Sequence, residues 1–480
     1  MNGKARELFK NLSYSVIANI VSMVISFVLV AIVPKVLGTG QYSLWQLYTF
    51  YASYVGFFHF GWADGVYLRY GGQEYKELDK RVFHAQYWLL TIFEVLLAAG
   101  ISIVALLAVS DVDKSHILVM VSLSCFLLLP RTFLQYVLQC TNRIGEYASS
   151  VLLEKILYCV LVLAMIFFGA RRYEYLLLAD IVAKLAALIS ICIICRDIVF
   201  ARGGSIKLGF REAFQNISVG IKLMFANVVG MLIIGIVRFS IEMVWGKETF
   251  GRVSLAMSVS NLLMLFISAI SIVIFPLLKR TAQERWAENY HHLRAMLVVP
   301  ILGALVLYYP AKMVFSRWLP AYAESLNYMA LLFPICLFEG KMSLLVNTYL
   351  KALRKEKLML LINIISVALS LLVSGVVIYA IKNLTLAVLS IVVLLAFRCE
   401  LAEWLLARQL KLKVKTDMLL ELVVVSVFVI SSWVLGGWVG FGIYVASFVV
   451  YVLCRARSIH QTIQLVLSQV KNRAKPQVAD

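Results

Sequence analysis

Long apolar segments follow one another along almost the whole chain. Crossing about 30 Å of hydrocarbon at 1.5 Å per residue takes roughly 20 apolar residues in a helix whose backbone groups are all bonded internally. With 62% hydrophobic and 15% charged residues, the chain is too apolar to hide its side chains in a soluble core. We therefore predict an all-α polytopic membrane protein. About 14 transmembrane helices are expected, near 12–33, 43–65, 84–109, 116–140, 147–169, 174–195, 217–243, 250–276, 293–315, 325–349, 358–381, 384–406, 417–435 and 439–455.

The first span has a second copy 208 residues later. Without a gap, residues 16–47 and 224–255 share eight identities, among them Asn19/Asn227 and Gly38/Gly246. Apolar helices look alike by composition, but a shared Asn inside an apolar segment and a shared Gly are not explained that way. We therefore predict two related halves.

The repeat predicts the organisation of the chain. An offset of six spans is even, so equivalent spans run in the same direction and the halves form a parallel repeat of two six-helix lobes. The two C-terminal helices lie outside the repeat. The predicted segments are an N-lobe over 1–200, a cytoplasmic linker over 201–216, a C-lobe over 217–412, the last two spans over 413–456 and a basic cytoplasmic tail over 457–480.

Lys and Arg gather in alternate connections, which places the N- and C-termini in the cytoplasm. The net charge of +19 follows from this topology and needs no nucleic acid to explain it. The cysteine and histidine positions predict no metal site, and no pattern indicates a cofactor or a catalytic residue. We expect a membrane protein that is not an enzyme, with the lipid bilayer as its surroundings.

Several charged residues lie inside the predicted spans, where each costs about 2.5–3.5 kcal/mol on insertion scales. Such groups face protein or water and are functional candidates. Six cations are candidates for a cavity between the lobes, and they are Arg131, Arg238, Lys341, Lys222, Arg398 and Arg69. Each could instead snorkel to an interface or form a buried salt bridge. That alternative is stronger for Arg69, Lys222 and Arg398, which lie near the cytoplasmic side.

The chain resembles the polysaccharide-transporter branch of the multidrug/oligosaccharidyl-lipid/polysaccharide exporter superfamily, the O-antigen and capsule repeat-unit flippases. The resemblance lies in the segments 34–45 and 61–72, and in 245–251 leading to 275–280. It extends over nearly the whole chain, including the fourteen-span layout.

This resemblance implies an alternating-access carrier in the bacterial inner membrane. It would move an undecaprenyl-diphosphate-linked oligosaccharide from the cytoplasmic to the outer leaflet for surface polysaccharide biosynthesis. Other polysaccharide assembly proteins would be its partners. Cavity cations would attract the diphosphate. Coupling to an ion gradient is also implied, and Asp64 and Glu94 are the candidates for it.

Two other functions fit parts of the sequence. An ion-coupled drug or metabolite antiporter of the same superfamily would share the repeat but hold its substrate with carboxylates. A membrane-embedded polysaccharide polymerase would present catalytic groups on a large outward loop, whereas the outward connections here are short.

Overall fold

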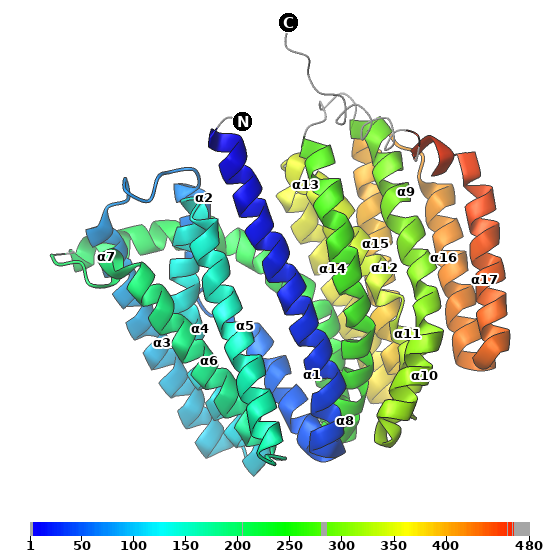
Figure 1. Cartoon of the computed structure of the whole chain (residues 1–480), viewed down its shortest axis with the longest axis horizontal. Helices are drawn as coiled ribbons and strands as arrows, with labels where there is room; N and C mark the ends of the chain where they lie inside the picture. The colour runs from blue at the N-terminus through cyan, green and yellow to red at the C-terminus, as the bar shows by residue number, and fades with distance from the viewer. Residues whose placement is uncertain (1–2, 204, 280–285, 458, 463, 465–480) are drawn as a thin grey trace, which may run out of the picture. The chain divides into compact units, whose positions relative to one another are not determined.

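The computed structural model describes residues 3–203, 205–279, 286–457, 459–462 and 464, and no strand occurs in these ranges. Within these ranges, eleven helices are long and apolar enough to cross a membrane, and a bent pair of helices counted as one span makes twelve. Two of these, α1 (Gly3–Val55) and α8 (Ile206–Lys279), each contain two helices joined at a kink. Counting both parts of each confirms the predicted polytopic protein of about 14 helices (Figure 1).

The chain forms two compact units, Met1–Leu232 with Trp245–Ser254, and Ile233–Val244 with Leu255–Asp480. Parts of α8 therefore belong to both. The first unit contains α1 and the start of α8, and in addition α2 (Trp62–Tyr70), α3 (Lys80–Ala108), α4 (Val112–Cys140), α5 (Ile144–Phe167), α6 (Tyr173–Ile194) and α7 (Arg196–Val199). Its core gathers apolar residues of α2, α3, α4 and α6, such as Phe83, Phe133 and Val137, all at most 1% exposed.

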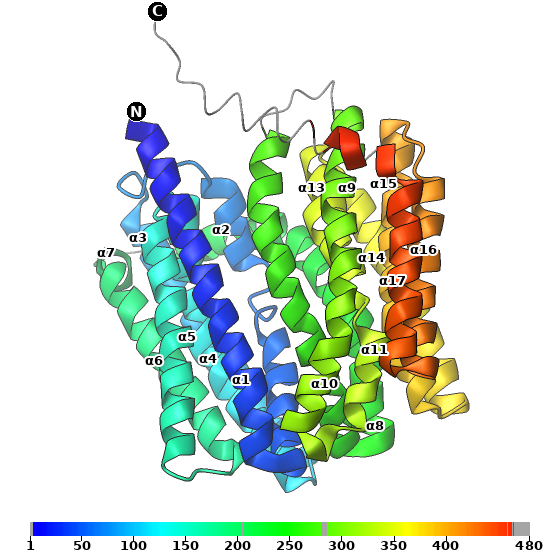
Figure 2. The same cartoon turned by 45° about the vertical axis from the view of Figure 1, so that its right-hand side comes forward.

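The second unit is a bundle of α9 (Trp286–Ala304), α10 (Tyr308–Trp318), α11 (Met329–Leu332), α12 (Ile335–Gly340), α13 (Asn347–Ala352), α14 (Glu356–Ser374), α15 (Leu384–Leu410), α16 (Lys415–Ile430) and α17 (Gly437–Cys454). A π-helix, Lys341–Val346, joins α12 to α13. The last two helices run side by side in both views (Figures 1 and 2).

The two kinks occupy equivalent positions of the internal repeat. Gly38 has φ 72° and ψ 176°, and Gly246 has φ 83° and ψ 175°. This region of backbone conformation is essentially restricted to glycine. An added Cβ at either position would meet nothing within 4 Å, so the conformation itself, not crowding, requires glycine there. The repeat recognised in the sequence thus reproduces the same turn twice.

The second predicted span, 43–65, is not continuous. The helix ends at Val55, and α2 begins at Trp62 after positive φ values at Phe60 and Gly61. Beyond this break, glycines let α2 cross the start of α8 closely. A Cβ on Gly65 would lie 1.9 Å from the carbonyl oxygen of Asn216. Small residues permit such close helix crossings in membrane proteins.

Two other segments differ from the expected outline. The predicted linker over 201–216 is helical from Ile206 onward, where α8 begins. The predicted span over 325–349 is a series of short helices with a 41° bend between Leu332 and Ile335, beside Pro334. Proline removes a backbone donor, which explains a break at this point. Most of the predicted tail, residues 465–480, lies outside the described residues.

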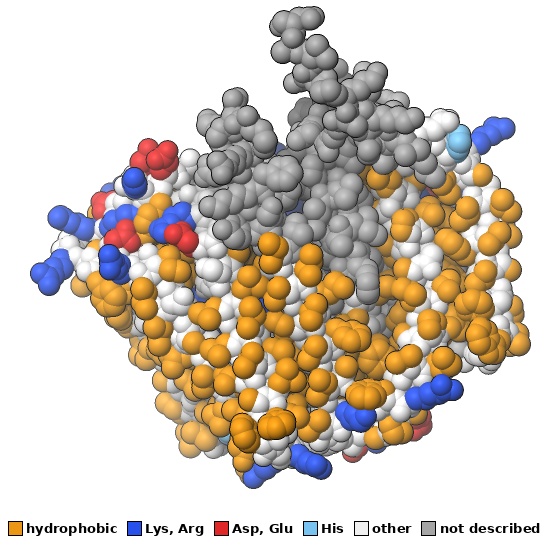
Figure 3. Space-filling view, in the orientation of Figure 1, with side chains coloured by type: hydrophobic (Ala, Val, Ile, Leu, Met, Phe, Trp, Pro, Cys, Tyr) orange, Lys and Arg blue, Asp and Glu red, His pale blue; other side chains and the backbone are white. Residues whose placement is uncertain are grey.

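Hydrophobic side chains cover most of the part of the face in Figure 3 that is not grey, while Lys, Arg, Asp and Glu side chains lie mainly at its upper left and along its lower edge. Many large apolar side chains are exposed on these helices, for example Leu107 at 83% and Trp438 at 83%. Such exposure suits contact with lipid, because hydrocarbon does not disfavour apolar side chains as water does.

Candidate functional site

Arg131 is a buried cation of the first unit. It follows Pro130 in α4, and its side chain is 4% exposed. Its Nη2 lies 2.5 Å from Oε2 of Glu154 on α5. The side-chain amide of Gln135 is oriented with its oxygen toward Arg131. That oxygen accepts hydrogen bonds from Nε and Nη2 of Arg131, each at 3.1 Å. Nη1 is buried and has no hydrogen-bond partner, so the guanidinium keeps donor capacity that no described side chain uses.

Arg69 is held between α2 and the first turns of α8. Its Nη2 donates to Glu212 at 2.9 Å and to Gln215 at 2.7 Å, and its Nη1 donates to Asn216 at 2.6 Å. Asn216 in turn donates to Gln86 of α3 at 2.7 Å. Arg69 therefore joins three helices of the first unit through a chain of hydrogen bonds.

The remaining predicted cations have different surroundings. Arg398 on α15 donates from Nε to Asn363 at 2.9 Å and from Nη1 to Glu339 at 3.2 Å, so it links α15 to α14 and α12. Lys222 on α8 is exposed, and Arg238 is half-buried on the same helix.

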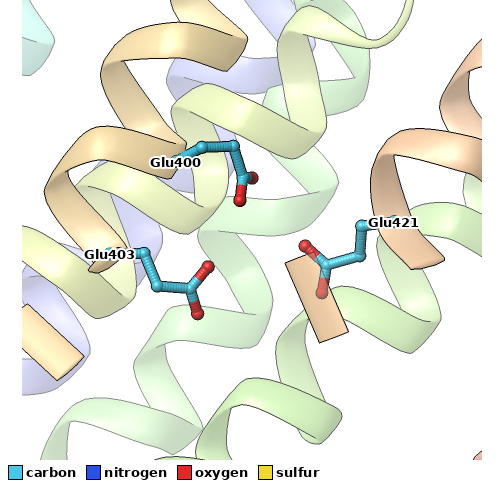
Figure 4. Close-up of side chains that lie close together, drawn as sticks. All are labelled: Glu400, Glu403 and Glu421. Carbon is cyan, nitrogen blue, oxygen red and sulfur yellow. The ribbon is translucent and has the colours of Figure 1, made fainter. Parts of the chain in front are cut away.

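Lys341 lies inside a cluster of charged side chains in the second unit. Its side chain is 0% exposed, and its Nζ donates to Glu400 at 2.6 Å, to Glu403 at 2.8 Å and to Glu421 at 2.8 Å. An ammonium group has three N–H donors, so all of them are used. Glu400 and Glu403 come from α15 and face Glu421 on α16, as Figure 4 shows.

A second cation, Arg294 of α9, completes the cluster. Its Nε donates to Oε1 of Glu403 at 2.7 Å, and its Nη2 lies 2.5 Å from Oε1 of Glu421. Its Nη1 lies 3.7 Å from Asp417, which also contacts Arg455 at the end of α17. We call these seven side chains the ionic cluster, namely Lys341, Arg294, Arg455, Glu400, Glu403, Glu421 and Asp417.

Carboxylate oxygens of Glu400, Glu403 and Glu421 lie within 4.8 Å of one another, a spacing that a metal ion could bridge. The ammonium of Lys341 bonds to all three carboxylates, so it already supplies the positive charge between them. The donor set is therefore satisfied by a tethered cation of the chain itself.

The two predicted ion-coupling residues are both buried in the first unit. Glu94 on α3 is 0% exposed. Its Oε2 accepts a hydrogen bond from the Cys125 thiol at 3.5 Å, and its Oε1 has no hydrogen-bond partner among the described residues. No described cation forms a salt bridge with it. Asp64, in the first turn of α2, is 5% exposed, 3.8 Å from Nε2 of His59 and 3.5 Å from the hydroxyl of Tyr136.

Sequence reasoning did not select Arg294, Asp417 or Glu421, because they lie near the ends of their spans, where charges normally reach water. One signal was available. Asp417 and Glu421 are spaced i,i+4, which puts two acids on one face of an apolar helix, where like charges repel without a cation partner.

Comparisons with known proteins concern both family and fold. A family model described as "Polysaccharide biosynthesis protein" matches residues 8–282. A search among curated proteins finds no match. Among solved structures, one titled "Lipid II flippase MurJ, inward closed conformation" is 12% identical with a TM-score of 0.61, covering 92% of this chain and 99% of that chain. An inward-facing multidrug resistance MATE family transporter of the MOP superfamily is 12% identical with a TM-score of 0.57, covering 82% and 98%. The likenesses establish a shared fold.

Proposed function

Because this chain belongs to the polysaccharide biosynthesis protein family, whose model matches residues 8–282, we propose that it is a flippase for lipid-linked oligosaccharides. It moves repeat units linked to undecaprenyl diphosphate from the cytoplasmic to the outer leaflet of the bacterial inner membrane, with both termini in the cytoplasm. The fold shared with a lipid II flippase supports a lipid-linked substrate.

The observation that carries the proposal is the state of Arg131. A buried guanidinium that has one carboxylate partner and an unused Nη1 can donate to a second anion. A diphosphate leaving water needs such donors to replace its hydration. Lys222 and Arg238 are further cations that we assign to the substrate path. Arg69, Lys341 and Arg398 are bound by side-chain partners, and we assign them to positioning of the helices.

Proton coupling is assigned to the first unit. A fully buried carboxylate without a cation partner is strongly disfavoured, and this supports our assignment of a bound proton to Glu94. Asp64 has two polar neighbours and lies at a helix N-terminus, where negative charge is stabilised. Glu94 is thus the carboxyl group that holds a proton, and Asp64 is the one that ionises more easily.

The proposal is tested in cells that lack this protein, by mass spectrometry of lipid-linked sugars together with a membrane-impermeant glycan probe. A complete repeat unit that accumulates facing the cytoplasm is the expected result, and it identifies the glycan. Unpolymerised units facing outward would point to a polymerase. No lipid-linked accumulation would contradict the flippase and point to a drug or metabolite antiporter, which the family match does not favour.

A further inference from the structure

The ionic cluster contains more carboxylates than cations. Within the part of the chain that the structure describes, four carboxylates, of Glu400, Glu403, Glu421 and Asp417, face three cations, of Lys341, Arg294 and Arg455. Arg398 adds no positive charge, because it is paired with Glu339. If all groups were ionised, the cluster would hold one uncompensated negative charge between packed helices, which is costly in a medium of low dielectric constant.

Other titratable groups beside the cluster do not remove this excess. Tyr290, Cys399 and Tyr451 carry no positive charge in any protonation state, and Tyr290 donates its hydroxyl proton to Glu403 at 2.8 Å. Burial, and after it the like charges of Arg294 and Arg455, disfavour a positive charge on the ring of His291. A bound proton is then the simplest way to balance the cluster.

The contacts identify which carboxyl group takes up that proton. Glu403 and Glu421 each contact Lys341 through one oxygen and Arg294 through the other. Both oxygens of Asp417 contact arginines. Among the described residues, Glu400 is the one carboxylate of the cluster that contacts a single cation through a single oxygen, Oε1, and its buried Oε2 has neither a hydrogen bond nor an ion pair there.

From these contacts we infer that the ionic cluster is a proton-binding site and that Glu400 carries the proton on Oε2. The side chain of Glu400 is 12% exposed, more than those of the other three carboxylates, so it also offers the shortest route for proton exchange. Because Lys341 already fills the space between the carboxylates, the site takes a proton and not a metal cation. Loss of the proton leaves a net negative charge among the buried side chains of the ionic cluster.

The site does not depend on which substrate the protein carries, and its test reads protonation directly. Infrared difference spectra between alkaline and neutral pH would be recorded on the purified, reconstituted full-length protein. The carbonyl stretch of a protonated carboxylic acid is expected in the wild type at neutral pH, and Glu400→Gln should lose one such band. Glu324→Gln, an exposed acid of the same unit, is the matched control and should leave the spectrum unchanged.

Four further variants make the outcome decisive. If the band is absent, unchanged in Glu400→Gln, or lost instead in Glu403→Gln or Glu421→Gln, the assignment is wrong. Glu400→Gln should fold, because an amide replaces a protonated acid without changing charge. Should it not fold, Glu400→Asp keeps the acid and is expected to shift the band, and an unshifted band would overturn the assignment. Glu94→Gln should remove a different carbonyl band from Glu400→Gln. The proton coupling proposed for Glu94 can therefore fail without affecting the assignment of Glu400.

Discussion

The ammonium of Lys247 lies 2.7 Å from Oδ2 and 3.0 Å from Oδ1 of Asp111. Lys247 directly follows the kink glycine Gly246, and Asp111 is the N-cap residue of α4, where it accepts from the backbone N–H of Lys114 at 3.0 Å. A second carboxylate, of Asp113, lies 3.3 Å from the same ammonium. The kink of α8 is thereby tied to the connection between α3 and α4, within the first unit.

The ion pair between Lys247 and Asp111 should make the stability of the folded protein depend on pH in the acid range. The hydrogen bond from Lys247, with that from Lys114, holds the pKa of Asp111 below its ordinary value of 3.8. A lowered pKa in the folded state stabilises the protein above the unfolded-state pKa, and the effect is lost as the pH falls through the folded-state pKa. The pair is partly exposed, so we expect Lys247→Ala to cost about 0.2–1 kcal/mol at neutral pH and nothing well below pH 3.8.

Thermal unfolding in detergent at several pH values measures this difference, with the exposed Lys76→Ala as control. A difference between wild type and Lys247→Ala that persists unchanged at the lowest pH would argue against the ion pair as its source.

The kink glycines should not tolerate alanine. At Gly38 and Gly246 the added Cβ meets no atom, so the expected cost of about 1–3 kcal/mol for each comes from backbone conformation alone. Gly40→Ala is the matched control, because Gly40 also has open space around it and has no positive φ. Equal melting temperatures for Gly38→Ala and Gly40→Ala would contradict the explanation.

Arg131→Ala should reduce transport without removing the protein from the membrane. Loss of a charge-assisted hydrogen bond to the diphosphate is expected to lower the transport rate by about tenfold or more. Arg238→Ala should likewise reduce transport. Leaflet location of the lipid-linked sugar, at matched protein levels, is the measurement.

The double variant Arg131→Ala with Glu154→Gln separates binding from packing. If Arg131 only neutralises Glu154, removal of both charges should restore transport. If Arg131 contacts the substrate, as proposed, the double variant should remain as defective as Arg131→Ala.

Lys341→Met should destabilise the second unit strongly. The substitution removes the cation shared by three carboxylates, and breaking a buried ion pair in this way costs about 3–5 kcal/mol. Lys351→Met changes an exposed lysine of the following helix and should cost little. Fluorescence-detected size-exclusion chromatography after heating compares the two, and similar melting temperatures would show that the cluster does not hold the unit together.

Glu94→Gln should leave folding intact and abolish the response of transport to a proton gradient. The amide matches the size of a protonated acid but cannot release a proton. The comparison is transport with and without an imposed gradient, with the exposed Glu77→Gln as control. A gradient response equal to that of the wild type would remove Glu94 from the coupling step.

Sequence patterns alone were enough for the fold class, because span length and backbone hydrogen bonding in lipid allow few alternatives. The repeat located Gly38 and Gly246 as equivalent, and the structure places the same backbone turn at both. Span two was expected to be continuous because most of its residues are apolar. Its break depends on positive φ at Phe60 and Gly61, and hydropathy does not report φ.

The partners of each charge became visible only through packing. The sequence placed Lys341, Glu400 and Glu403 inside spans, yet it could not show that Arg294, 47 residues before Lys341, and Glu421, 80 residues after it, meet them. Ion pairs between helices depend on helix rotation and crossing, which depend on contacts distant in the chain. Composition and periodicity therefore identify a polytopic membrane protein with charged spans, while the three-dimensional arrangement distinguishes the enclosed ammonium of Lys341 from the guanidinium of Arg131 with its unused donor.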